Sequence, residues 1–141
     1  MTGGADGVVQ VWSVPLGRKV PGCADSAGLP VNSIDTKGSL VLASSDRACW
    51  LWRAATQSQS ESKAPLNLLH KLTGHASTVV TAKLTPDCRH AASGGREIKL
   101  WDIATGDCTR TIDAFSKCLA LDVNEQGSLL ITGHADKGLR L

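Results

Sequence analysis

The sequence predicts an all-β protein built from repeated antiparallel sheets. Three segments look alike, because each alternates apolar and polar residues and carries a Trp near its end: residues 7–13, 49–53 and 98–102. A period of two residues is typical of a half-buried strand. No stretch shows the 3.6-residue apolar period of a helix, and Gly, Pro, Asp and Ser separate many short apolar runs. These two observations favour the all-β class.

The spacing of the tryptophans predicts the architecture. Trp12, Trp52 and Trp101 are 40 and 49 residues apart, and the next aromatic position of the series would be 142. A period of about 40–45 residues is typical of a propeller blade. The longer interval contains residues 54–67, which are polar and proline-bearing, so we expect a surface loop inserted within one blade.

The whole chain, residues 1–141, is therefore predicted to be an incomplete propeller of about three four-stranded antiparallel blades. The predicted units are a partial blade at residues 1–22, a blade at 30–72 with the insert 54–67, a blade at 78–113 and a second partial blade at 117–141. Blades bury their faces on one another and occur in rings of about four to eight. We therefore expect the chain to be a fragment of a longer protein.

Composition argues against several classes of site and partner. Fifteen basic and 13 acidic residues give a net charge of only +2, which is too small to indicate a nucleic acid or an anionic membrane as partner. The five cysteines are odd in number and none forms a Cys-x-x-Cys pair, so neither a disulfide framework nor a zinc site is predicted. No signal peptide or transmembrane span is recognisable, and we expect a reducing, cytoplasmic location, with no cofactor and no catalytic residue.

Two segments carry a family signature. Residues 72–75 read Leu-Thr-Gly-His and residues 99–102 read Lys-Leu-Trp-Asp, and together they resemble the WD40 repeat. The resemblance implies a hydrogen-bond network in each blade that joins a His, a Ser or Thr, an Asp and the Trp. In the most complete blade these are His75, Ser93 and Trp101. Its Asp is missing, because the turn at residues 94–97 is shorter than the turn of the family.

The other blades show the opposite pattern, with the Asp present and the upstream His absent. An Asp precedes the aromatic position by six residues in each, and each keeps a hydroxyl partner: Asp6 with Trp12 and Thr2, Asp46 with Trp52 and Ser44, Asp136 with position 142 and Thr132. His134 follows a Gly, as in the signature, but it falls between Thr132 and Asp136. We therefore predict a solvated turn residue at His134.

A narrower resemblance concerns residues 30–141. The segments 70–75, 80–83, 98–102 and 132–140 resemble the C-terminal propeller of the autophagy-related protein sixteen family, and the stretch Gly-His-Ala-Asp-Lys at 133–137 is its most distinctive feature. The resemblance implies an adaptor in autophagosome formation whose partners are the autophagy conjugation complex or cargo receptors. It also implies recruitment to autophagosome precursor membranes through those partners.

The predicted function is a non-catalytic protein–protein interaction scaffold. Arg47, Arg96 and Lys137 lie near tight turns, where exposed cationic side chains favour contact with partners. A scaffold of an unrelated complex, such as a ubiquitin ligase or a signalling adaptor, remains an alternative. Two weaker alternatives are a cysteine-dependent enzyme, based on Cys88, His90 and His75, and a nucleic-acid-binding propeller. The second rests on five basic residues: Arg89, Arg96, Lys99, Lys137 and Arg140.

Overall fold

The computed structural model of the chain describes residues 1–13, 15, 18–25, 28–54 and 66–141. All the regular secondary structure in those residues is β-strand, which confirms the predicted all-β class. The strands are β1 (Thr2–Gly3), β2 (Val8–Ser13), β3 (Arg18–Asp25), β4 (Val31–Lys37), β5 (Leu40–Ser45), β6 (Ala48–Ala54), β7 (Leu66–Thr73), β8 (Thr81–Leu84), β9 (His90–Gly94), β10 (Glu97–Asp102), β11 (Cys108–Asp113), β12 (Cys118–Val123), β13 (Leu130–His134) and β14 (Leu139–Arg140).

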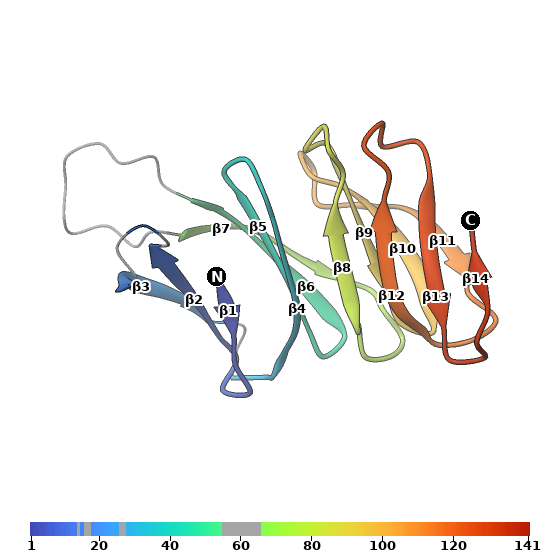
Figure 1. Ribbon diagram of the computed structural model, residues 1–141, viewed down its shortest axis with the longest axis horizontal. Helices are drawn as coiled ribbons and strands as arrows, with labels where there is room; N and C mark the ends of the chain where they lie inside the picture. The colour runs from blue at the N-terminus through green and yellow to red at the C-terminus, as the bar shows by residue number, and fades with distance from the viewer. Residues whose placement is uncertain (14, 16–17, 26–27, 55–65) are drawn as a thin grey trace.

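The strands form four antiparallel sheets that follow one another along the chain. The first sheet is β1–β2–β3, the second β4–β5–β6–β7, the third β8–β9–β10–β11 and the fourth β12–β13–β14. The sheets stand side by side, and β4, β8 and β12 are neighbours in space (Figure 1). Consecutive sheets packed face to face agree with the predicted partial WD40 propeller.

Each strand that carries a repeated Trp faces in two directions because its side chains alternate. In β6, Cys49 and Leu51 point into the core shared with the third sheet, whereas Trp52 packs with Val9 and Val41 against the first sheet. Trp101 of β10 likewise packs against the preceding sheet, and it is 1% exposed. Each of these tryptophans thus fills the space between its own sheet and the one before it.

The alternation of side chains also sets the direction of Trp12, but this Trp is exposed. Val9 and Val11 of β2 face the second sheet, so alternation turns Trp12 to the other face. None of the core clusters in the described residues of the chain includes Trp12, whose side chain is 43% exposed.

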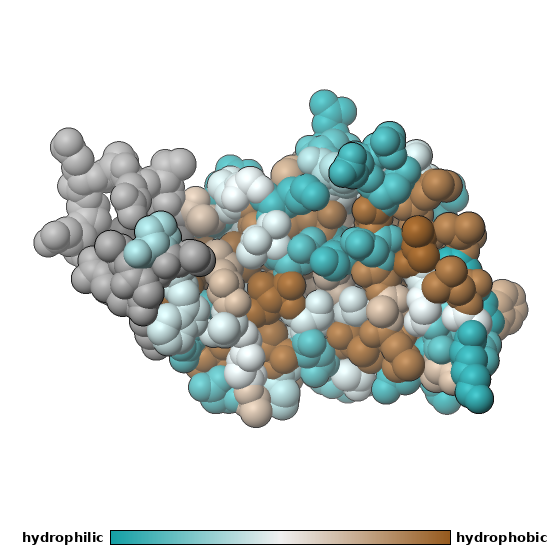
Figure 2. Space-filling view, viewed as in Figure 1, coloured by the Kyte–Doolittle hydropathy of each residue, from teal (hydrophilic) through white to brown (hydrophobic). Residues whose placement is uncertain are grey.

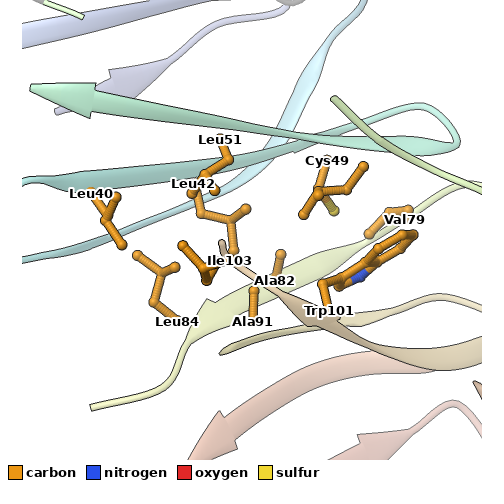
Figure 3. Packing of buried hydrophobic residues seen from close by; sticks show 11 residues of the cluster. Leu40, Leu42, Cys49, Leu51, Val79, Ala82, Leu84, Ala91, Trp101 and Ile103 are labelled. Atoms are coloured by element: carbon orange, nitrogen blue, oxygen red, sulfur yellow. The ribbon is translucent and has the colours of Figure 1, made fainter. Parts of the chain in front are cut away.

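The largest core cluster joins the second and third sheets. Leu40, Leu42, Cys49 and Leu51 face Trp101 and the apolar residues of β8 and β9 (Figure 3). Burying one such aliphatic side chain stabilises the fold by about 1.5–3 kcal/mol, so this cluster is a major source of the attraction between the two sheets.

Polar groups add a second connection between neighbouring sheets. The Asp35 carboxylate of β4 accepts a hydrogen bond from the Leu84 amide at 2.8 Å, and its other oxygen lies 3.6 Å from the Lys83 ammonium. Main-chain bonds recur at the other end of the strands: Val31 N donates to Gly4 O at 3.0 Å, Val79 N to Asp46 O at 2.6 Å and Cys118 N to Gly95 O at 2.7 Å. The acceptors occupy equivalent positions, each two residues after Thr2, Ser44 or Ser93.

Antiparallel pairing places the connections between strands in two groups, one at each end of the strands. We call the surfaces that these connections form the front edge and the back edge of the molecule. The front edge carries the turns at residues 46–47, 95–96 and 135–138, together with the loops 74–80 and 114–117. The back edge carries the turns at 38–39, 85–89, 103–107 and 124–129. Residues of the two edges are separated by the length of the strands, so they form separate surfaces.

The structure refines several predicted boundaries. Ala54 pairs with Leu66 and Arg53 with Asn67, so the ends of the predicted insert 54–67 belong to β6 and β7. Leu66 is 7% exposed and packs in the core, which explains why the strand starts there. Residues 55–65 of the insert lie outside the described residues. β3 continues to Asp25, beyond the predicted limit of residue 22.

The fourth sheet presents apolar side chains to solvent. Hydrophobic residues gather over β12–β14 at one end of the molecule (Figure 2). They include Leu119, Leu129, Ile131, Leu139 and Leu141, which are 49%, 53%, 38%, 75% and 85% exposed.

Candidate functional site

A buried hydrogen-bond network lies in the third sheet. The Ser93 hydroxyl of β9 lies 2.6 Å from His75 Nε2 and accepts a hydrogen bond from Trp101 Nε1 at 2.8 Å. All three side chains are buried, at 5%, 0% and 1% exposure for His75, Ser93 and Trp101. The structure therefore brings together the three residues proposed from the sequence. The network that they form joins the loop 74–80 to β9 and β10.

Glu97 is the carboxylate that faces His75, whose Nδ1 has no hydrogen-bond partner among the described residues. Its Oε1 lies 3.6 Å from His75 Nδ1 and accepts a hydrogen bond from Ala76 N at 2.9 Å. A carboxylate facing Nδ1 favours the tautomer with the proton on Nδ1, so we assign Nε2 as the acceptor of the Ser93 hydroxyl proton. Sequence reasoning missed Glu97 because it searched for an Asp six residues before the Trp, where Gly95 stands.

Burial dominates the electrostatics of this network. It lowers the pKa of His75 to about 4, with a smaller lowering by the Lys99 charge and an opposing effect of Glu97. His75 is therefore neutral at pH 7. Burial raises the pKa of the Cys49 thiol of the second sheet to about 12, and the Ser93 side chain has a smaller, opposing effect. Cys49 is therefore a neutral, buried thiol and not a nucleophile.

The fourth sheet contains a second histidine network that contradicts the prediction for His134. His134 is the last residue of β13 and is only 5% exposed. Its Nε2 lies 2.8 Å from the Thr132 hydroxyl, and its Nδ1 lies 3.0 Å from the Ser116 carbonyl oxygen. The prediction of a solvated turn residue was wrong, because the imidazole is buried and both of its nitrogens are paired: Nδ1 donates to the Ser116 carbonyl and Nε2 bonds to the Thr132 hydroxyl.

Asp136 does not take part in that network. Its carboxylate accepts from Gly138 N at 2.9 Å and pairs with Arg140 Nη2 at 2.7 Å. The bond to Arg140 and the Gly138 amide lower the pKa of Asp136 to about 2. Asp136 therefore organises the turn at 135–138.

The first and second sheets hold only fragments of such a network. Trp12 Nε1 donates to the Thr2 hydroxyl at 2.9 Å in an exposed setting, and Asp6 accepts from the Val8 amide at 3.1 Å. In the second sheet the Ser44 hydroxyl is buried and has no hydrogen-bond partner among the described residues. Asp46 forms the turn at 46–47 with a positive φ of 48°. The structure thus does not join Asp6 to Trp12 or Ser44 to a histidine.

A family model for the WD domain, G-beta repeat, matches residues 66–102. The match begins with β7 and ends with the Trp101-Asp102 pair, so it spans one strand of the second sheet and three of the third. It contains the whole His75–Ser93–Trp101 network. The predicted resemblance to WD40 repeats is confirmed.

Similar proteins extend the likeness over almost the whole chain. Protein tipD of Dictyostelium discoideum is 34% identical over 144 residues, which is 99% of this chain and 22% of that protein. Autophagy-related protein 16 of Arabidopsis thaliana is 30% identical over 145 residues, 99% of this chain and 27% of that protein. NACHT domain- and WD repeat-containing protein 1 of Mus musculus is 25% identical over 138 residues, 94% of this chain and 8% of that protein. The chain spans about a quarter of the length of the first two relatives.

The three cationic residues expected to contact partners all lie on the front edge of the sheets. Arg47 has a side chain that is 65% exposed, and Arg96 and Lys137 are exposed as well. Arg47 borders a hollow of about 250 Å³ that is also lined by Trp50 and Lys71. The Lys71 ammonium lies 4.6 Å from the centre of the Trp50 ring, and Trp50 stacks on Trp52 with 6.3 Å between ring centres.

The residues behind the weaker alternatives are only partly gathered, because Cys88 and His90 line one hollow whereas His75 lines another. Cys88 lies on the back edge, where its thiol donates to the Lys37 carbonyl at 3.8 Å, whereas His75 is buried at the front edge. Lys99 is buried and donates to the Thr111 hydroxyl at 2.9 Å, so it adds nothing to an exposed basic patch. Within the described ranges of the chain, no three His, Cys, Asp or Glu side chains are grouped closely enough to hold a metal ion. The described residues also form no helix suited to crossing a bilayer.

Proposed function

We propose that this chain is a non-catalytic scaffold that binds other proteins through the front edge of its sheets. WD40 repeats are generally protein-interaction modules, and a fold of this kind leaves the choice of partner to its surface residues. The buried networks of the third and fourth sheets hold the front-edge loops 74–80 and 114–117 in place. Rigid loops lose little conformational entropy on binding, which favours recognition.

The observation that carries this proposal is the hollow beside Arg47. It combines an aromatic ring, Trp50, with two cationic side chains, Arg47 and Lys71. Trp and Arg are the residue types that contribute most to protein interfaces. Arg96 and Lys137 are further exposed cations on the front edge, each next to a carboxylate in sequence, so we expect the hollow itself, with Arg47, Lys71 and Trp50, to receive acidic and apolar residues of a partner segment.

We further propose that this scaffold serves autophagosome formation. The support is the likeness to Autophagy-related protein 16 of Arabidopsis thaliana over 99% of this chain. The partners would then be proteins of the autophagy conjugation complex or cargo receptors, met in the cytoplasm and at autophagosome precursor membranes. A scaffold of an unrelated complex is the second candidate, because the NACHT domain- and WD repeat-containing protein 1 of Mus musculus matches 94% of this chain.

The experiment compares two double variants of equal charge change in cells. Arg47→Glu with Arg96→Glu alters the front edge, and Lys37→Glu with Arg110→Glu alters exposed residues away from it. We expect the first variant to lose at least about tenfold in co-precipitation of its partners, since reversed charges repel an acidic segment. The control variant should keep them, and both should melt like the unmodified chain.

Two results would contradict the proposal. Equal partner recovery by both variants would remove the front edge as the binding surface. Recovery of a stable partner set without any autophagy protein, under conditions that induce autophagosomes, would reject the autophagy assignment and support the unrelated scaffold. Lys137 is left unchanged in this test because its φ is 65°, and a substitution at such a position can alter the conformation of the turn as well as its charge.

A further inference from the structure

The back edge has a cleft between the second and third sheets. Its volume is about 580 Å³, and its lining includes Arg53 of β6, His70 of β7 and the residues 88–90 that end the β8–β9 turn. Ligand sites usually measure about 300–1,000 Å³, so the back-edge cleft is large enough for one or two side chains of a partner. It lies across the strands from Arg47 and the front-edge hollow.

The floor of the back-edge cleft is apolar. Ile103 is 7% exposed and belongs to the core cluster between the two sheets, and Leu69 and Cys88 pack against the same cluster. An aliphatic group placed here would leave water for a surface already backed by the core, which is favourable at about 25 cal/mol per Å².

The rim of the back-edge cleft is cationic. Arg53 comes from the second sheet and Arg89 from the third, and neither guanidinium lies within 4 Å of a carboxylate of any described residue. His90 adds an imidazole whose Nδ1 is 4.0 Å from Asp87. Two guanidinium groups on one cleft, with no carboxylate partner among the described residues, favour an anionic ligand, because the Arg fork matches the geometry of a carboxylate or a phosphate.

The carboxylate in the lining is occupied. Asp102 Oδ1 accepts hydrogen bonds from Ala104 N at 2.8 Å and Thr105 N at 3.0 Å, and these bonds lower its pKa. Asp102 therefore shapes the 103–107 turn that walls the back-edge cleft. Its Oδ1 is held by amides in the turn, and its carboxylate makes no ion pair with Arg53 or Arg89, so both guanidinium groups can face a ligand.

The wall of the cleft is closely fitted. Gly106 has a φ of 79°, and a Cβ built on it would lie 2.7 Å from His70 Nδ1. The absence of a side chain at Gly106 lets the 103–107 turn of the third sheet close over the His70 ring of the second. The back-edge cleft is thus formed by a contact between two sheets and has a defined shape.

We propose that the back-edge cleft binds an acidic peptide segment of a partner protein. A carboxylate side chain lies on Arg53 and Arg89, and an adjacent aliphatic side chain lies on the floor formed by Leu69, Cys88 and Ile103. The apolar floor favours a peptide over inorganic phosphate or a phosphate headgroup, which has no group to place there. This second surface goes beyond the front-edge scaffold function and does not depend on it.

The test measures peptide binding to the complete chain by fluorescence anisotropy. The probes are labelled Leu-Glu-Leu-Glu-Leu and its uncharged counterpart Leu-Gln-Leu-Gln-Leu, with inorganic phosphate as competitor. We expect the acidic peptide to bind and the glutamine peptide to bind at least roughly tenfold more weakly. Arg53→Glu with Arg89→Glu should weaken binding of the acidic peptide by a similar factor, whereas Arg47→Glu at the front edge should leave it unchanged.

Several outcomes would overturn the proposal. Equal binding of both peptides, or no loss in the Arg53→Glu with Arg89→Glu variant, removes the guanidinium groups from recognition. A loss caused by Arg47→Glu alone places the peptide at the front edge. Displacement of the acidic peptide by inorganic phosphate, at concentrations too low to act by screening charge alone, assigns the cleft to phosphate groups. Arg53→Gln with Arg89→Gln repeats the measurement without charge reversal, and its melting curve shows whether the fold is intact.

Discussion

His134 Nε2 lies 2.8 Å from the Thr132 hydroxyl on its own strand, β13, and His75 Nε2 lies 2.6 Å from the Ser93 hydroxyl of β9. The two imidazoles reach equivalent hydroxyl positions from different places, one from β13 and one from the loop before β8. The fourth sheet therefore has a histidine partner for its hydroxyl although its loop 114–117 contains none.

Replacing His134 tests this second network. His134→Ala removes the side-chain partner of the Ser116 carbonyl and leaves the Thr132 hydroxyl with only its 3.4 Å bond to the Arg140 carbonyl, so we expect a loss of about 1–3 kcal/mol in the free energy of unfolding. Urea denaturation followed by tryptophan fluorescence measures it. His90→Ala is the matched control, because His90 is exposed, and a loss in the control as large as in His134→Ala would contradict the buried role.

Trp101 should contribute more to stability than Trp12, although both occupy the repeated position. Trp101→Ala opens a cavity in the core between the second and third sheets, with an expected loss of about 3–5 kcal/mol. Trp12 is 43% exposed, so Trp12→Ala should cost less than about 1–2 kcal/mol. Equal shifts of the denaturation midpoint would show that the assigned packing of Trp101 is wrong.

Two buried serines at equivalent positions should respond in opposite ways to alanine. Ser93 bonds to His75 and Trp101, and its loss leaves both unpaired, so Ser93→Ala should destabilise by about 1–3 kcal/mol. The Ser44 hydroxyl has no partner among the described residues. Ser44→Ala removes a desolvated polar group and should be neutral or stabilising by up to about 1 kcal/mol. Thermal melts of the pair decide the matter, and a destabilising Ser44→Ala would reveal a bond that the structure does not contain.

Stability should fall with acidification because of His75. Its pKa is about 4 in the folded chain against an ordinary value of 6.5, so below pH 6.5 the unfolded chain binds the proton and the folded chain does not. The stabilisation is fully present above pH 6.5 and is lost between pH 6.5 and about 4, with a size on the order of 2–3 kcal/mol.

The variant His75→Gln isolates this effect. It cannot titrate, so its unfolding free energy should change less between pH 7 and pH 4 than that of the unmodified chain. His90→Gln, at an exposed position, should keep the original pH dependence. Parallel pH profiles for the unmodified chain and His75→Gln would refute the assignment of a neutral buried imidazole.

Gly106 and Gly127 separate backbone strain from side-chain collision. Both have positive φ, 79° and 71°, so an alanine at either position adopts an unfavourable conformation at a cost of about 1–2 kcal/mol. At Gly127 the nearest atom to a new Cβ is Pro86 Cδ at 3.7 Å, an ordinary contact, whereas at Gly106 it is His70 Nδ1 at 2.7 Å. Gly106→Ala should therefore lose a further 1–3 kcal/mol or so. Equal losses in chemical denaturation would mean that His70 moves aside freely.

The strands were predictable from the sequence because alternation and the Trp positions report directly on which face is buried. The segments around Trp52 and Trp101 form β6 and β10 at the expected places. The sequence did not show which of the repeated tryptophans is buried. The exposure of Trp12 depends on which sheet covers each face of its strand, and this is set by the tertiary packing of the sheets.

The candidate site was only partly predictable. His75, Ser93 and Trp101 followed from the WD40 resemblance, but Glu97 did not, because a longer side chain two positions along from Gly95 reaches the same imidazole. His134 was misread because its neighbours in sequence are turn formers, while its partners, Thr132 and Ser116, are set by pairing. Cys49 gave no signal, since an isolated cysteine is indistinguishable in sequence from a small apolar residue, and its burial depends on the packing of the second sheet against the third.

The repeated main-chain bonds from Val31, Val79 and Cys118 have a consequence for how such a surface diversifies. Their acceptors are the main-chain carbonyl oxygens of Gly4, Asp46 and Gly95, so none of these bonds depends on a side chain. Alignment of one sheet on the next is in this respect indifferent to the side chains that neighbouring turn positions, such as Arg47 and Arg96, display. New specificities can arise at such neighbouring positions by single substitutions, without a compensating change in the framework that carries them.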